Sequence, residues 1–140
     1  MLHKLTMNNK KVWAFGICLF SIISCEEKLP FVPDYEIAVG IVLGSENCKS
    51  DPSKNAWLVQ LPGPNAGNKI YGDNIIYNNI AYSNVVKIFS LPDSSKAPSK
   101  RYLFEFYFQG RSSSGSCDAP NPVNFNITNI RLKELGRVAK

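Results

Sequence analysis

Few side chains in this 140-residue chain are suited to covalent or acid–base chemistry. Its thiols belong to four cysteines, Cys18, Cys25, Cys48 and Cys117. His3 is its one histidine, and Glu105 stands out among the acids because it lies between phenylalanines in the stretch RYLFEFYFQG. A thiol can be modified, oxidised or bound to a metal, and a carboxylate can act in glycoside hydrolysis when a second one lies nearby. Their roles depend on which of them remain in the mature chain and on the elements that position them.

An uncharged apolar run follows two lysines near the N-terminus. As a helix, these roughly 12 residues from Val12 to Ile23 would extend about 18 Å, well short of the about 30 Å of a bilayer core. Two lysines, a short apolar run and the small Ser24 are typical of a secretory signal peptide. A buried core helix and an ordinary signal peptide cleaved elsewhere are the competing interpretations. Translation could begin at Met1 or at Met7.

The tetrad Ile22-Ile23-Ser24-Cys25 resembles the lipobox of bacterial lipoproteins. The resemblance implies that the Cys25 thiol receives a diacylglyceryl group, that the chain is cut just before it, and that the new N-terminus is acylated, for example with palmitate. Two or more acyl chains hold a protein firmly at a membrane. Glu26 and Glu27 resemble a surface-export signal, although they also suit a solvated tether, and residue 26 is not the aspartate that retains enteric lipoproteins in the inner membrane. We therefore expect a lipid anchor at the outer membrane, on its surface or its periplasmic face.

Removal of residues 1–24 changes the charge that bears on partners. The whole chain has 16 basic and 11 acidic residues, a net charge of +5. The removed segment contains three lysines and no acid, so 13 basic and 11 acidic residues remain and the net charge falls to +2. Nucleic-acid binding needs a basic stripe that neutralises phosphates. The near-neutral charge of an exported domain argues against a nucleic-acid partner.

Two cysteines remain once Cys18 leaves with the signal peptide and Cys25 carries the lipid. In an oxidising compartment Cys48 and Cys117 are expected to form a disulfide, and closing a loop of about 70 residues would stabilise the fold by roughly 4 kcal/mol. Two thiols without a histidine fall short of the four ligands of a structural zinc site, so we expect no metal and no other cofactor. Loss of His3 also removes the base of Ser-His-Asp and Cys-His arrangements. We expect no catalytic residues.

Apolar and polar residues alternate along the rest of the chain, as in β-strands. Segments with one apolar face are Ile37–Leu43, Trp57–Leu61, Tyr102–Phe108 and Val123–Ile127. Residues 68–92 predict one or two further strands, with turns near Gly72-Asp73 and Asn78-Asn79. No segment has a convincing helical period, and the sequence contains no internal repeat.

Two of these segments predict which side chains face inward. In the aromatic segment the apolar face comprises Tyr102, Phe104, Phe106 and Phe108, and the opposite face comprises Leu103, Glu105, Tyr107 and Gln109. The last segment begins with Val123, Phe125 and Ile127 inward and then changes parity to Ile130 and Leu132. One extra residue near Thr128 or Asn129 would restore the inward face, which predicts a β-bulge there.

Five or six short strands in about 100 residues predict an all-β domain, either a small antiparallel barrel or a sandwich. The domain is expected to span residues 35–140, after a signal peptide (1–24) and a proline-containing lipidated tether (25–34). The order of Cys48, Trp57, the Leu91-Pro92 turn and Cys117 resembles small uncharacterised bacterial envelope lipoproteins of OB-like β-barrel type. The resemblance implies the barrel and brings no established activity.

Two classes of function suit such a domain. The first is a non-catalytic binding or accessory module whose partner is an envelope protein, a peptide or a polysaccharide. The second is a structural subunit of an envelope assembly, and a carboxylate-dependent glycan hydrolase around Glu105 is the least favoured alternative. The candidate ligand face comprises Tyr77, Glu105 and Tyr107. Exposed rings clustered in a groove would favour binding, whereas a flat apolar patch would favour assembly.

Overall fold

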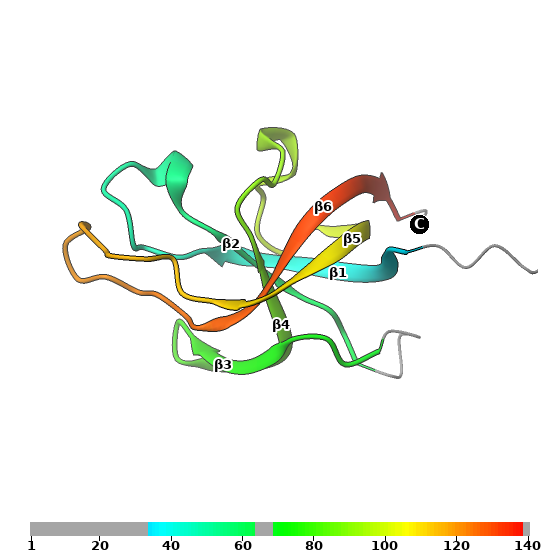
Figure 1. Cartoon of the computed structure of the whole chain (residues 1–140), viewed down its shortest axis with the longest axis horizontal. Coiled ribbons are helices and arrows are strands. Elements are labelled where there is room, and N and C mark those ends of the chain that lie inside the picture. Colours follow the sequence, from blue (N-terminus) through cyan, green and yellow to red (C-terminus); the bar gives the residue numbers. More distant parts are fainter. Residues whose placement is uncertain (1–33, 64–68, 139–140) are drawn as a thin grey trace, which may run out of the picture. The chain divides into compact units, whose positions relative to one another are not determined.

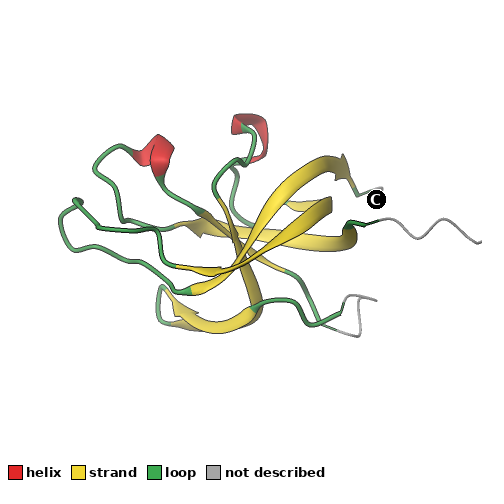
Figure 2. Cartoon of the chain, viewed as in Figure 1, coloured by secondary structure: helices red, strands yellow, loops and turns green. Residues whose placement is uncertain are grey.

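The regular structure of the domain seen in the computed structural model is nearly all β-strand (Figure 1). The structure describes residues 34–63 and 69–138, so the predicted signal peptide, Cys25 and nearly all of the tether lie outside the described residues. The strands are β1 (Glu36–Ser45), β2 (Trp57–Gln60), β3 (Asp73–Tyr77), β4 (Ile80–Ile88), β5 (Arg101–Ser112) and β6 (Ile127–Arg137). The helical segments of the described part are two short 3-10 turns, Pro52–Lys54 and Asp93–Ser95 (Figure 2). The predicted all-β class with five to six strands is confirmed.

Five of the strands close into a ring. β1 pairs with β2 and β5, β2 pairs with β4, and β6 pairs with β5 and β4, so the order around the ring is β1-β2-β4-β6-β5. β3 lies outside the ring and pairs with β4. This arrangement is a small OB-like barrel and not a sandwich of two sheets. The expected antiparallel sheet needs one correction, because β4 and β6 meet in parallel at Lys87 and Asn129.

The barrel interior is filled by the aromatic side chains of β5. Phe104 and Phe106 are fully buried, as the alternation predicted, whereas Phe108 of the same predicted face is 46% exposed. β1 makes room for them with a small residue, because a Cβ at Gly40 would lie only 2.7 Å from the Phe104 ring and 2.6 Å from the Val59 side chain. The more apolar face of β1 therefore points outward, and Ile37 is 48% exposed.

A second apolar cluster lies outside the barrel, where β3 covers β2 and β4. Leu58 of β2 and Val85 of β4 point away from the barrel interior and pack against Ile75 of β3. β2 and β4 are thus buried on both faces, which explains their continuous apolar runs. The predicted turn between β3 and β4 is confirmed: Asn78 and Asn79 have φ values of 52° and 62°, as a tight hairpin of type I′ requires.

The pairing of β5 with β6 shifts register at two places. One shift lies where the bulge was predicted, opposite Asn129, but the extra residue is Gln109 of β5 and not a residue of β6. The second inserts Lys133 into β6. β6 therefore alternates regularly from Ile127 to Ile130, which places Ile127 in the outer cluster and Ile130 in the barrel.

The predicted inward position of Val123 is wrong. Val123 is 41% exposed and lies in the connection before β6, where it forms an isolated bridge with Asn47. The predicted strand began too early: residues before Ile127 run alongside the β1–β2 connection and are not part of β6. Only Phe125 and Ile127 of that segment pack in the outer apolar cluster.

Candidate functional site

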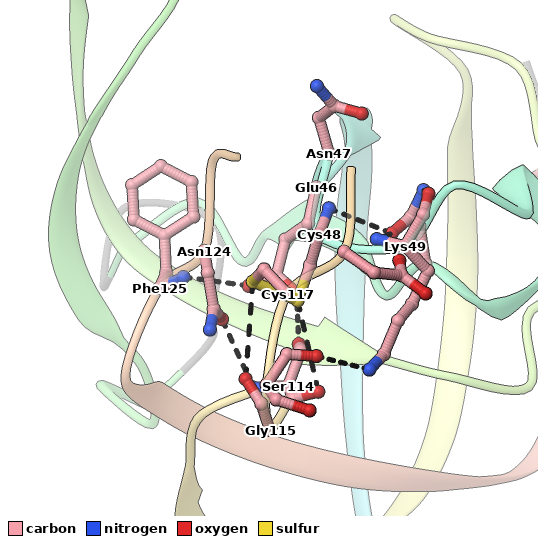
Figure 3. The surroundings of a disulfide bond; sticks show 12 residues. Glu46, Asn47, Cys48, Lys49, Ser114, Gly115, Cys117, Asn124 and Phe125 are labelled. Carbon is pink, nitrogen blue, oxygen red and sulfur yellow. Dashed lines mark hydrogen bonds between the residues drawn. A yellow bond between two sulfur atoms is a disulfide. The ribbon is translucent and has the colours of Figure 1, made fainter. Parts of the chain in front are cut away.

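Cys48 and Cys117 form a disulfide, which confirms the predicted pair (Figure 3). Cys48 lies in the β1–β2 connection and Cys117 lies 69 positions later, in the β5–β6 connection. Backbone hydrogen bonds reinforce the link, since the N–H of Asp118 donates to the carbonyl of Cys48 at 2.9 Å and Asn47 pairs with Val123. The two connections are therefore joined at one end of the barrel.

A buried ion pair that the sequence analysis missed ties the same connections to β4. The ammonium of Lys87 lies 3.5 Å from a carboxylate oxygen of Glu46, and neither side chain reaches solvent. Lys87 also donates to the Phe125 carbonyl at 2.8 Å and to the Ser114 hydroxyl at 3.2 Å. Burial lowers the pKa of Lys87, and Glu46 opposes that shift. The signal in the sequence is a single lysine inside the apolar run of β4.

The surface that OB-fold proteins commonly use for ligands is filled by the chain itself. Such proteins bind ligands on the face of their second and third barrel strands and on the adjoining loops. The corresponding strands are β2 and β4, whose outward side chains Leu58, Val85 and Lys87 are all buried. β3 covers the first two, and the β5–β6 connection contacts the third. This face is therefore not open to a ligand.

Glu105 and Tyr107 lie on the outward face of β5. Glu105 accepts a hydrogen bond of 2.8 Å from the ammonium of Lys133, the extra residue of β6. The same ammonium lies 3.5 Å from the centroid of the Tyr35 ring. The hydrogen bond to Glu105 is the main cause that raises the pKa of Lys133. Lys133 is thereby held as a cation between a carboxylate and an aromatic ring.

A second cation stacks on the neighbouring tyrosine. The guanidinium of Arg131 lies 4.7 Å from the centroid of the Tyr107 ring, within the range of a cation–π contact. Tyr35 and Tyr107 meet edge to face at 6.3 Å. These contacts join five residues into one surface, which we call the tyrosine–cation face: Tyr35, Glu105, Tyr107, Arg131 and Lys133. It offers ordered rings and charges suited to binding polar or charged groups.

Tyr77 does not lie on this face. Its hydroxyl donates to the Ser45 carbonyl at 3.1 Å, and its ring meets Phe125 at 6.4 Å. A Cβ at Gly44 would lie 2.3 Å from the hydroxyl oxygen of Tyr77. The structure therefore brings Glu105 and Tyr107 together but places Tyr77 in the apolar cluster under β3.

Glycoside hydrolysis at Glu105 would need a second carboxylate, and the one that β6 places opposite Glu105 is Glu134. Glu134 stands opposite Glu105 in the ladder, and the extra residue Lys133 binds the Glu105 carboxylate. A substrate would have to displace this lysine before it could reach the carboxylate of Glu105. The geometry therefore suits an ion-paired surface better than a general acid.

Within residues 34–63 and 69–138, no three His, Cys, Asp or Glu side chains gather closely enough to hold a metal ion. The same part of the chain contains no helix of the length and apolar character needed to cross a membrane. Comparison of the chain with protein-family models, curated proteins and solved structures found no match.

Proposed function

We propose that this chain is a lipid-anchored envelope lipoprotein whose domain is a non-catalytic binding module. The anchor is the acylated Cys25, and the binding surface is the tyrosine–cation face. The observation that carries the proposal is the pair of cation–π contacts that fix Tyr35 and Tyr107 on the outside of the barrel. Rings and cations held in place lose little conformational entropy when a partner binds. The partner is an envelope protein or polysaccharide that presents polar or anionic groups.

A structural subunit of an envelope assembly is the second candidate, and the β3–β4 hairpin favours it. Ile76 is 70% exposed and Ile80 is 54% exposed. Ile76 lines an open hollow of about 390 Å³, and Ile80 lies directly after the turn between β3 and β4. Among the described strands β3 pairs with β4 alone, and an apolar strand at a sheet edge is a template for pairing with another chain.

The anchor is tested by growing cells with a labelled fatty acid. The wild-type chain should become labelled and the Cys25→Ala chain should not. Equal labelling of the two chains would refute lipidation at Cys25. Protease treatment of intact cells then distinguishes the two faces of the outer membrane, because a surface domain is cleaved and a periplasmic domain is protected.

The binding surface is tested by placing a photo-crosslinking amino acid at position 107 or at position 76 in intact cells. A binding module that uses the tyrosine–cation face should give a discrete product from position 107, and Arg131→Gln should reduce its yield about five-fold or more. A product from position 76 alone would instead favour the assembly subunit. Circular dichroism of each purified variant checks that the domain is folded.

A further inference from the structure

Three cations without an ion-pair partner meet where β5 begins and β6 ends. They are Lys100, Arg101 and Arg137, and none of them takes part in the ion pairs formed within the described ranges. The β5–β6 ladder pairs Tyr102 directly with Arg137, and Lys100 and Arg101 precede Tyr102 in the chain. Three exposed cations thus gather around one tyrosine at this end of the sheet, where an anion would find several positive charges.

The cations surround a hollow of a size that suits a small ligand. One part, of about 400 Å³, is lined by Lys100, Arg101, Tyr102, Arg137 and Val138. An adjoining part, of about 190 Å³, shares Tyr102 and Arg137 and adds Ser94, Ser95, Leu135 and Gly136. We call the two parts together the basic hollow. Ligand sites commonly measure about 300–1,000 Å³.

Within residues 34–63 and 69–138, no ion pair balances the charge of the basic hollow. Asp93 precedes Ser94, but its carboxylate is held by Lys96 at 2.7 Å. Glu134 is exposed on β6 and stands opposite Glu105, three positions before Arg137. The residues that line the hollow therefore include two arginines and one lysine together with a tyrosine and two serines.

We propose that the basic hollow binds a phosphate group. Guanidinium forks match the oxygens of phosphate in pairs, and a lysine ammonium adds a point charge. A phosphate offers enough oxygens and negative charge for two forks, one ammonium and the surrounding hydroxyl groups, whereas a single carboxylate offers two oxygens. The phosphate can come from a soluble phosphate ester or from a phospholipid headgroup, since both present the same chemistry.

This site is separate from the tyrosine–cation face and does not depend on lipidation at Cys25. Tyr102 precedes Tyr107 by five positions on β5, which corresponds to about 17 Å along a strand. The side chain of Tyr102 also packs toward the barrel, whereas Tyr107 points outward. A phosphate in the basic hollow would thus leave the proposed partner surface accessible.

The test is a titration of the purified full-length chain with inorganic phosphate, in which isothermal titration calorimetry measures the dissociation constant. Arg101→Gln and Arg137→Gln should each raise the dissociation constant about ten-fold, because each removes charge-assisted hydrogen bonds. Arg111→Gln is the matched control, since it removes the same charge from the same sheet outside the hollow, where Arg111 pairs with Asp73, and it should change the constant less than two-fold. Lys100→Gln, in the loop before β5, serves as the further variant if an arginine substitution prevents folding.

A second arm identifies the source of the phosphate. The same proteins are sedimented with vesicles of phosphatidylglycerol and with vesicles of phosphatidylcholine, so that attachment through an acyl chain contributes equally to both. Weaker binding of Arg137→Gln to phosphatidylglycerol alone assigns the hollow to a lipid headgroup, whereas an effect on inorganic phosphate alone assigns it to a soluble ester. The proposal is overturned if the wild type binds neither probe or if Arg111→Gln weakens binding as much as Arg137→Gln.

Discussion

Glu46 and Lys87 form an ion pair of 3.5 Å from which solvent is excluded. Glu46 follows β1 and Lys87 lies on β4, and both bind the β5–β6 connection: the N–H of Phe125 donates to Glu46 at 2.9 Å, and Lys87 donates to the Phe125 carbonyl at 2.8 Å. One pair thus joins three segments that are distant in sequence. Both groups find their partners inside the protein, so removing either one leaves the other as a buried charge that neither its partner nor water neutralises.

Lys87→Met is expected to lower the free energy of unfolding by about 3–5 kcal/mol, because it leaves the Glu46 carboxylate buried without its cation. Glu46→Leu should have an effect of similar size. The double variant should lose less than the sum of the two, since it leaves no buried charge. Guanidinium unfolding of the four proteins measures this coupling. Additive losses, or a cost below about 1 kcal/mol for Lys87→Met, would contradict it.

Loss of the Cys48–Cys117 disulfide should destabilise the domain by about 4 kcal/mol, since the bond closes a loop of 69 positions in the unfolded chain. The measurement compares urea unfolding of the wild type, oxidised and reduced, with that of the Cys48→Ser, Cys117→Ser double variant. The reduced wild type and the double variant should unfold at the same urea concentration. Equal stability of the oxidised and reduced wild type would be incompatible with a structural role.

The sequence predicted which face of a strand is buried where the strand's own side chains determine it, and failed where the side chains of neighbouring strands determine it. The alternation in β5 identified Phe104 and Phe106 as core residues because their volume must be buried somewhere. In β1 the same reasoning could not tell which face is internal, because the space there is set by rings from another strand. Ala38, Gly40 and Val42 occupy the interior positions, whereas Ile37, Val39 and Ile41 point outward.

Gly40→Ala tests this dependence of β1 on β5. The added Cβ would lie 2.6 Å from Val59 and 2.7 Å from Phe104, so one of these packed side chains must move. We expect a loss of about 1–3 kcal/mol in the free energy of unfolding. Gly63→Ala is the control, since a Cβ there has no neighbour within 4 Å, and it should be nearly neutral. Thermal unfolding of both variants decides the matter, and equal midpoints would show that the interior can adapt.

The candidate site was predictable to a smaller extent. The disulfide followed from counting the thiols that remain after the expected removal of the signal peptide and lipidation of Cys25, which needs no knowledge of the fold. The burial of Lys87 did not follow, because it depends on a connection that lies 27 positions beyond Lys87 in the sequence. Tyr77 was grouped with Tyr107 for a similar reason, since alternation along β3 cannot show that this strand folds over β2 and β4. Long-range packing, and not local pattern, separates these residues.

The hydroxyl of Tyr71 donates to Glu36 and should make the stability of the domain depend on pH. This hydrogen bond is the main cause that holds the pKa of Glu36 below its usual value of 4.5. A carboxyl group with a lowered pKa in the folded state contributes stability above about pH 4.5 and loses it as the pH falls through the folded value. Tyr71→Phe should therefore cost up to about 1 kcal/mol at pH 7, a modest figure because Glu36 is partly exposed, and less at pH 2.5.

The alkaline side supplies an independent check on the same variant. Burial, and then the bond to Glu36, raise the pKa of Tyr71 above its usual value of 10.0. The unfolded chain therefore releases the phenol proton first, and the stability of the wild type should fall as the pH rises above about 10. Tyr71→Phe has no phenol to ionise at this position, so its stability should fall less steeply than that of the wild type. Urea midpoints measured from pH 2.5 to 11 report both ends, and parallel curves for wild type and Tyr71→Phe would show that this hydrogen bond contributes nothing to folding.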